Sequence, residues 1–195
     1  FLVFMISHLV PSDPIASNMS PNAMSDPAAV AAYKARWGLD KPLMEQYFIY
    51  LSNLLRGDLG TSIRTGNPVI SDLKQFFPAT LELSIMAMLI AVLFGITFGI
   101  ISAVYRNKPF DYLVRTISIS GVSIPNFWFA LVMLLLFYSK WHLFPGGGRV
   151  SSRISAPTGG TGLYVWDALT SGNWPLFNDA LSHLILPAIV LGFFT

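Results

Sequence analysis

Residues 83–105 read LSIMAMLIAVLFGITFGIISAVY, and residues 116–139 read TISISGVSIPNFWFALVMLLLFYS. Neither stretch contains an Asp, Glu, Lys or Arg. As a helix rising about 1.5 Å per residue, each is long enough to cross the hydrocarbon core of a bilayer, which is about 30 Å thick. A short segment, RNKPFDYLVR at residues 106–115, joins them. The sequence therefore predicts a hairpin of two membrane-spanning helices, and hence an all-α, polytopic integral membrane protein.

The overall composition supports a membrane protein. The chain is 53% hydrophobic and only 11% charged, whereas soluble domains carry roughly 25% charged residues. A formal net charge of +2 is too small to suggest nucleic acid as a partner. The absence of cysteine excludes disulfides and thiolate metal sites.

Basic residues in the joining segment predict the orientation in the membrane. The topology-setting residues are Arg106, Lys108 and Arg115. Only Asp111 opposes them, and basic residues in short loops mark the cytoplasmic side. We therefore expect the flanking polar regions to lie on the outer face and the N-terminus to be cytoplasmic.

Three regions follow along the chain. Residues 1–10 are expected to be the end of a first transmembrane helix, with the tail of a cleaved signal peptide as the alternative. Residues 11–77 carry balanced charges and predict an extracytoplasmic helical module. Its expected helices run from Pro27 to Gly38, from about Pro42 to Gly57, and from Pro68 to Phe77.

The third region, residues 78–195, is expected to be a partial membrane core. Its predicted helices cover about residues 78–105, 112–140 and 184–195, with an outer loop at 141–183. Pro78 is expected to open the first of them, because proline suits the first helical position.

Small residues recur at every fourth position in the first span. They are Ala87, Ala91, Gly95, Gly99 and Ala103. Since apolar attraction between helices is weak in lipid, close backbone approach over small residues is a main source of packing. This packing stripe, as we call it, predicts a face buried against another helix. The alternative is an ordinary span with two scattered glycines.

Pro125 interrupts the second span. It removes a backbone donor and clashes with the carbonyl of Gly121, so a kink near the middle is expected. Ser120, Ser123 and Asn126 would then face protein or water instead of lipid. A bend that lines a solute path and a purely structural kink are equally compatible with this pattern.

The sequence contains no recognisable catalytic, cofactor-binding or metal-binding constellation. His8, His142 and His183 share no metal-ligand spacing. Glu82 is a candidate for binding a cation, but we favour a carboxylate that complements the dipole of a helix beginning nearby. A path for a solute remains the simplest prediction.

Six stretches resemble one family, and they occur in the same order along the chain as in that family. They are residues 9–14 (LVPSDP), 38–42 (GLDKP), 57–62 (GDLGTS), 78–83 (PATLEL), 121–127 (GVSIPNF) and 183–188 (HLILPA). Together they resemble the permease subunits of bacterial dipeptide/oligopeptide ABC transporters, and in particular the first of the two paired permeases.

The resemblance implies a six-helix subunit of the cell inner membrane that spans the lipid bilayer several times. The implied partners are a second homologous permease, two ATPase subunits, and an extracytoplasmic binding protein that delivers peptide. The sequence is expected to lack the start of helix 1 and everything after the start of helix 4, including the loop on which the ATPases dock.

The predicted function is therefore peptide import, with ATP hydrolysis on separate subunits. Related solutes, such as nickel chelates or glutathione, are an alternative on the same fold. A non-transport membrane scaffold and an intramembrane enzyme are the competing classes, and the substrate itself is not determined by these residues.

Overall fold

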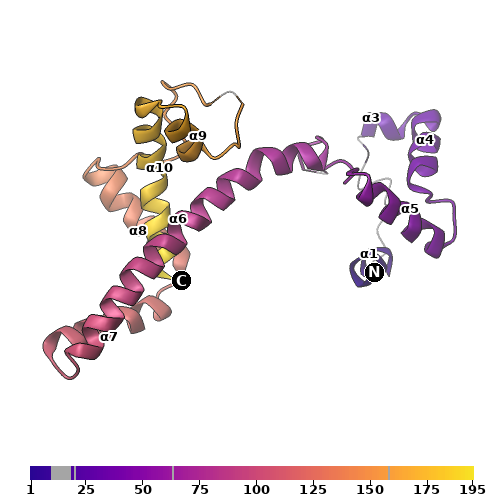
Figure 1. The fold of residues 1–195 in the computed structure, drawn as a ribbon. Coiled ribbons are helices and arrows are strands. Elements are labelled where there is room, and N and C mark those ends of the chain that lie inside the picture. The colour runs from indigo at the N-terminus through magenta and orange to yellow at the C-terminus, as the bar shows by residue number, and fades with distance from the viewer. Residues whose placement is uncertain (10–18, 20, 63, 158) are drawn as a thin grey trace. The chain divides into compact units, whose positions relative to one another are not determined.

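The computed structural model describes residues 1–9, 19, 21–62, 64–157 and 159–195 (Figure 1). Across these residues the regular secondary structure is helical, apart from an isolated antiparallel bridge between Thr61 and Pro68. The prediction of an all-α fold is confirmed. The expected junction at residues 10–18, between the first helix and the helical module, lies outside the described residues. The chain forms two compact units, Phe1–Lys74 and Gln75–Thr195.

The first unit contains short helices: α1 (Leu2–Leu9), α3 (Pro21–Met24), α4 (Pro27–Trp37) and α5 (Leu43–Leu55). Asp26 caps α4 by accepting a hydrogen bond from the Ala28 N–H at 2.9 Å. Gly38 ends the same helix at φ 62°, a left-handed conformation that glycine adopts readily. The predicted helix from Pro27 to Gly38 is confirmed, as is the helix that follows Pro42.

A single helix, α6 (Val69–Val104), runs for 36 residues with Pro78 inside it. The predicted division into a short helix ending at Phe77 and a span beginning at Pro78 is therefore wrong. A proline removes only one intrahelical hydrogen bond, and no glycine stop precedes it between residues 69 and 77. The Thr80 hydroxyl donates to the Phe76 carbonyl at 3.3 Å beside it, and the helix continues.

The second apolar stretch forms two helical pieces instead of one kinked helix. They are α7 (Pro109–Ser123) and α8 (Asn126–Met133), and a π-helical turn, η1 (Leu134–Lys140), extends α8. The two arms meet at 110°. Ile124 is extended, at φ −93° and ψ 131°, because a residue before proline is disfavoured in the helical conformation. The predicted interruption at Pro125 is confirmed. It divides the helix predicted over 112–140 into two, where a kink in one helix was expected.

The region predicted as a loop at 141–183 contains α9 (Tyr164–Thr170) and the first half of α10 (Trp174–Phe193). The prediction that the last helix begins at 184 is wrong. The side chain of Asn173 caps α10 by accepting from the Leu176 N–H at 3.2 Å, and Pro175 occupies its first turn. These start signals lie about ten residues before the apolar run, and the apolar pattern alone does not reveal them.

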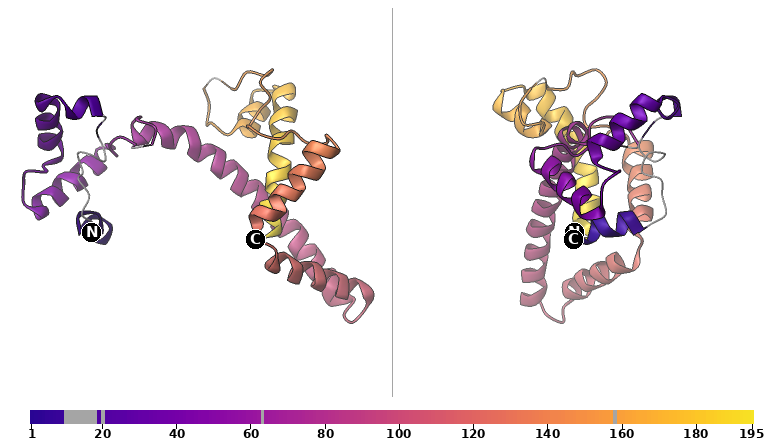
Figure 2. Two further views of the ribbon diagram at one scale, coloured as in Figure 1. Left: turned by 180° about the vertical axis from the view of Figure 1, so that it is seen from behind. Right: turned by 90° about the vertical axis from the view of Figure 1, so that its right-hand side faces the viewer.

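In the second unit α10 packs against both α9 and α8 (Figure 2). Judged by length and composition, α6 and α10 are each able to cross a membrane. The bent pair Pro109–Gly121 and Asn126–Lys140 adds a third span if it is counted as one. Within the described residues, the helices of this unit thus agree with a polytopic membrane protein.

Candidate functional site

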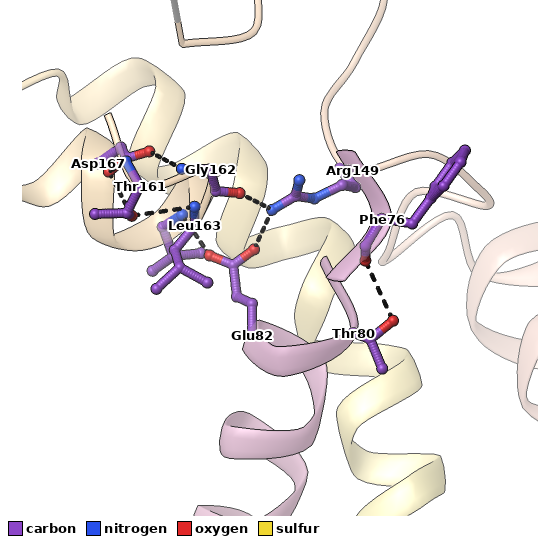
Figure 3. A network of polar contacts seen from close by, with 9 residues as sticks. Phe76, Thr80, Glu82, Arg149, Thr161, Gly162, Leu163 and Asp167 are labelled. Atoms are coloured by element: carbon purple, nitrogen blue, oxygen red, sulfur yellow. Dashed lines mark hydrogen bonds and ion pairs between the residues drawn. The ribbon is translucent and has the colours of Figure 1, made fainter. Parts of the chain in front are cut away.

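A polar network ties the 149–165 segment to α6 (Figure 3). One oxygen of the Glu82 carboxylate accepts from the Arg149 guanidinium at 2.8 Å, and the other accepts from the Val165 N–H at 2.7 Å. Arg149 also donates to the Gly162 carbonyl at 2.8 Å, and its guanidinium carbon lies 3.6 Å from the centre of the Tyr164 ring. Glu82 is only 11% exposed at its side chain. The network is therefore a largely buried, charge-assisted clamp.

The clamp corrects our interpretation of Glu82. We expected its carboxylate to complement the dipole of a helix beginning at Pro78. Because α6 begins at Val69, Glu82 lies well inside the helix, beyond the turn where a helix dipole acts strongly. Its carboxylate is satisfied by Arg149 and Val165 instead.

Asp167 organises the turn before α9. Its carboxylate accepts from the Thr161 N–H at 3.0 Å, the Thr161 hydroxyl at 2.8 Å and the Gly162 N–H at 2.9 Å. Burial raises the pKa of Asp167, but the hydrogen bonds from Thr161 and Gly162 outweigh it and hold the pKa below the ordinary value. Nearby, Asp179 of α10 accepts from both the N–H and the hydroxyl of Ser151, at 2.7 and 2.6 Å. The 149–163 segment is thus fixed at several points.

The basic segment between α6 and α7 is organised by one buried carboxylate. Asp111 is 1% exposed and accepts from the Ser102 hydroxyl, the Asn107 N–H and the Arg115 guanidinium. Lys108 lies over the ring of Tyr105, 5.0 Å from its centre. Arg106, Lys108 and Arg115 are all exposed, and the ion pair with Asp111 partly offsets the charge of Arg115.

A cavity of about 470 Å³ lies between α6, α8, α10 and the glycine-rich turn before Arg149. Its polar lining side chains are Asn126, the first residue of α8, and His183 of α10. His183 is buried, with Nδ1 2.8 Å from the Asp179 carbonyl oxygen. The remaining lining residues are Leu83, Phe127, Ala130, Leu134, Pro145, Gly146, Gly147, Gly148, Leu186, Pro187, Val190, Leu191 and Phe194.

The structure brings one of the four expected path residues to this cavity. Asn126 lines it, whereas Ser120, Ser123 and Pro125 are not among its lining residues. The Ser123 hydroxyl donates to the Ile119 carbonyl at 3.0 Å, so its hydrogen bond is made within α7. Pro125 acts indirectly, because the break before α8 sets the position of Asn126. Sequence reasoning missed His183 as a lining residue, and its position one turn before Pro187 was the available signal.

The packing stripe is buried at only one end, where it faces α10. Ala87 is 2% exposed, and a Cβ placed on Gly192 would lie 2.7 Å from its carbonyl oxygen, so α6 and α10 approach closely there. Ala91 is half-buried, whereas Gly95, Gly99 and Ala103 are exposed. Burial of the last three against another helix stays a prediction.

The described residues contain no group of three or more His, Cys, Asp or Glu that could hold a metal ion. The charged side chains of the clamp, Glu82 and Arg149, bind each other and the backbone. The cavity offers apolar walls with one amide and one imidazole, a lining of the kind found in small-molecule binding sites.

Residues 95–195 match the family described as "Binding-protein-dependent transport system inner membrane component". The match covers just over half of the chain and includes the broken helix and α10. The chain belongs to this family of inner membrane transport components, which are not enzymes.

Individual relatives match as well, most of them over a longer part of the chain. The probable D,D-dipeptide transport system permease protein DdpB of Escherichia coli (strain K12) is 50% identical over 192 residues, covering 98% of this chain. The dipeptide transport system permease protein DppB of Alkalihalophilus pseudofirmus is 40% identical over 194 residues. The glutathione transport system permease protein GsiC of Escherichia coli O6:H1 is 42% identical over 135 residues, or 69% of this chain and 43% of its own length. The chain spans 56% of the length of the first two.

Proposed function

We propose that this chain is part of the membrane-spanning subunit of an ATP-driven, binding-protein-dependent importer and forms part of the path for di- or oligopeptides. The observation that carries the proposal is the family match over residues 95–195, which includes the broken helix and most of the cavity lining. Relatives named as dipeptide permeases support peptides as the solute. Glutathione is the second candidate, because one relative is named as a glutathione permease.

The proposed partners are a second homologous permease, two ATPase subunits and an extracytoplasmic binding protein. In this arrangement the N-terminus and the 106–115 segment are cytoplasmic. The short 106–115 segment carries Arg106, Lys108 and Arg115, and basic residues in short loops mark the cytoplasmic side. Residues 11–77 and the 141–173 region then lie outside, where the binding protein docks. The expected division of the chain, with residues 1–10 ending a first helix and residues 11–77 forming a module, belongs to the same proposal.

The cavity at the helix break is proposed to contact the solute. Asn126 presents an amide that hydrogen-bonds a peptide backbone, and the apolar walls accept an uncharged side chain. Alternating access requires an element with two arrangements, and the extended residues Ile124 and Pro125 offer a hinge between α7 and α8.

Uptake in a strain lacking its own peptide permease tests the proposal when the complete gene is supplied. Pro125→Ala and Asn126→Leu are expected to lower uptake of a labelled dipeptide while membrane levels of the protein stay unchanged. Ser152→Ala, an exposed change in the 149–163 segment, is the matched control. Unchanged uptake in both variants would remove the break from the path, and competition by dipeptides against glutathione would rank the two solutes.

A further inference from the structure

Helix α5 carries an apolar stripe that the described part of the first unit leaves largely uncovered. Met44, Phe48, Leu51 and Leu55 follow one another at helical spacing and lie on one side of the helix. Met44 is 57% exposed, Phe48 62% and Leu55 81%. A long stripe of large exposed apolar side chains marks a surface that is covered in the assembled protein.

Besides α4, the apolar helix α1 contacts α5 in this unit. The ring of Phe1 lies 5.3 Å from that of Tyr47, and the ring of Phe4 lies 5.4 Å from Tyr47 and 5.7 Å from Tyr50. Tyr47 borders the α5 stripe, whereas Tyr50 lies further around the helix. Helix α1 has no Asp, Glu, Lys or Arg, and residues 2 and 6, Leu and Ile, are 75% and 60% exposed. The two helices therefore present apolar surface side by side.

We propose that α5 lies flat at the outer membrane interface, with Met44, Phe48 and Leu55 inserted into the acyl boundary of the lipid. This rests on the proposed function in one respect, the placement of residues 1–10 at the end of a membrane helix. If α1 is in the bilayer, its contacts with Tyr47 and Tyr50 hold α5 at bilayer level. Tyrosine is enriched at that depth, because its ring is amphipathic.

The distribution of charge on α5 favours lipid over a protein partner. The stripe contains no charged residue, and the exposed ion pair between Lys41 and Glu45 lies beside it. Asn53 lies on the opposite side of the helix, five residues from Phe48 and two from Leu51. A helix with one apolar face and one polar face is typical of interfacial anchors.

The absence of cysteine from the chain allows a direct test. Phe48→Cys and the matched control Asn53→Cys, on the opposite side of the helix, are introduced into the full-length protein, with any cysteine elsewhere replaced by Ser. Each variant is labelled with an environment-sensitive fluorophore in phosphatidylethanolamine–phosphatidylglycerol vesicles. Acyl-brominated lipid is expected to quench the label at position 48 several-fold more than the label at 53, and aqueous iodide is expected to show the reverse.

Equal quenching at positions 48 and 53 would overturn the inference. Protection of position 48 from iodide only after the external binding protein is added would also overturn it, because protein instead of lipid would then cover the stripe. Peptide uptake is measured for the same variants. Uptake without lipid quenching contradicts this inference alone, and lipid quenching in a protein that transports no peptide contradicts the proposed function alone.

Discussion

The span predicted from Pro78 onward occupies residues 78–104 of α6, and its two halves, residues 78–91 and residues 92–104, have different surroundings. In the first half, Glu82 binds Arg149 and Ala87 is buried beside Gly192 of α10. In the second half, a methyl group placed at the Cβ position of Gly95 or Gly99 meets no described atom within 4 Å. Figure 2 shows α10 beside the middle of α6, whereas α7 lies near only the C-terminal end of α6. Regular spacing of small residues thus identifies a face suited to close packing, and only the fold shows which part of it the chain fills itself.

The exposed half of α6 is the natural contact for a partner in the membrane. A helix that approaches Gly95 and Gly99 gains close backbone packing, which drives association in lipid. We infer that a partner helix covers this half, and under the proposed function that helix belongs to the second permease. Changes in the clamp, at the contact with α10 and at Gly99 test this difference.

The largest effect is expected from Glu82→Ala. Removing the carboxylate leaves the Arg149 guanidinium and the Val165 N–H without their partner in a largely buried place. Breaking such a pair from one side lowers the free energy of unfolding by about 3 kcal/mol. Thermal unfolding of the full-length protein in detergent measures the loss.

Two further variants control for this result. Arg153→Ala removes an exposed charge from the same segment and is expected to leave stability unchanged. The double variant Glu82→Ala with Arg149→Ala is expected to be no less stable than Glu82→Ala alone, since the unpaired charge is gone. Additive losses would show that the two side chains act independently.

The next effect separates the two halves of the packing stripe. Gly192→Ala places a methyl group 2.7 Å from the Ala87 carbonyl oxygen and is expected to lower the stability of the subunit by about 1–3 kcal/mol. Gly99→Leu has open space around its Cβ and is expected to leave subunit stability unchanged while weakening co-purification with the second permease. A loss of subunit stability in Gly99→Leu would contradict the assignment of this face to a partner.

The smallest effect concerns the pH dependence of the turn that Asp167 holds beside the clamp. The folded pKa of Asp167 lies below the ordinary value, so its stabilising contribution is complete above that value and is lost as the pH falls through the folded pKa. Hydrogen exchange at residues 161–165, corrected for its intrinsic pH dependence, is expected to accelerate at acidic pH. Asp167→Asn is expected to show fast exchange at neutral pH already. Exchange that does not change with pH in the wild type would contradict this.

Local signals in the sequence predicted several elements well. Asp26, Pro27 and Gly38 predicted α4 because capping is decided within a few residues. Pro125 predicted the interruption of the second span, since proline restricts itself and the residue before it. The same reasoning failed at Pro78, where the helix continues, because one lost hydrogen bond does not end a helix by itself.

The cavity and the clamp were not predictable in this way. Glu82 and Val165 are 83 residues apart, and Glu82 and Arg149 are 67 apart. No local pattern pairs residues at such distances. Their contact depends on the return of α10 along α6 and on the folding of the 149–163 segment across both.

By itself, the sequence determined that the chain is helical and apolar enough for a membrane, because helix formation and burial in lipid depend on composition and local hydrogen bonding. It also determined where the second span is interrupted. Only the tertiary structure decided that Glu82 pairs with Arg149, that Asn126 and His183 share a cavity, and that Ala87 is buried while Gly99 is not. The physical reason is that each of these depends on close packing between helices distant in sequence, which local preferences do not encode.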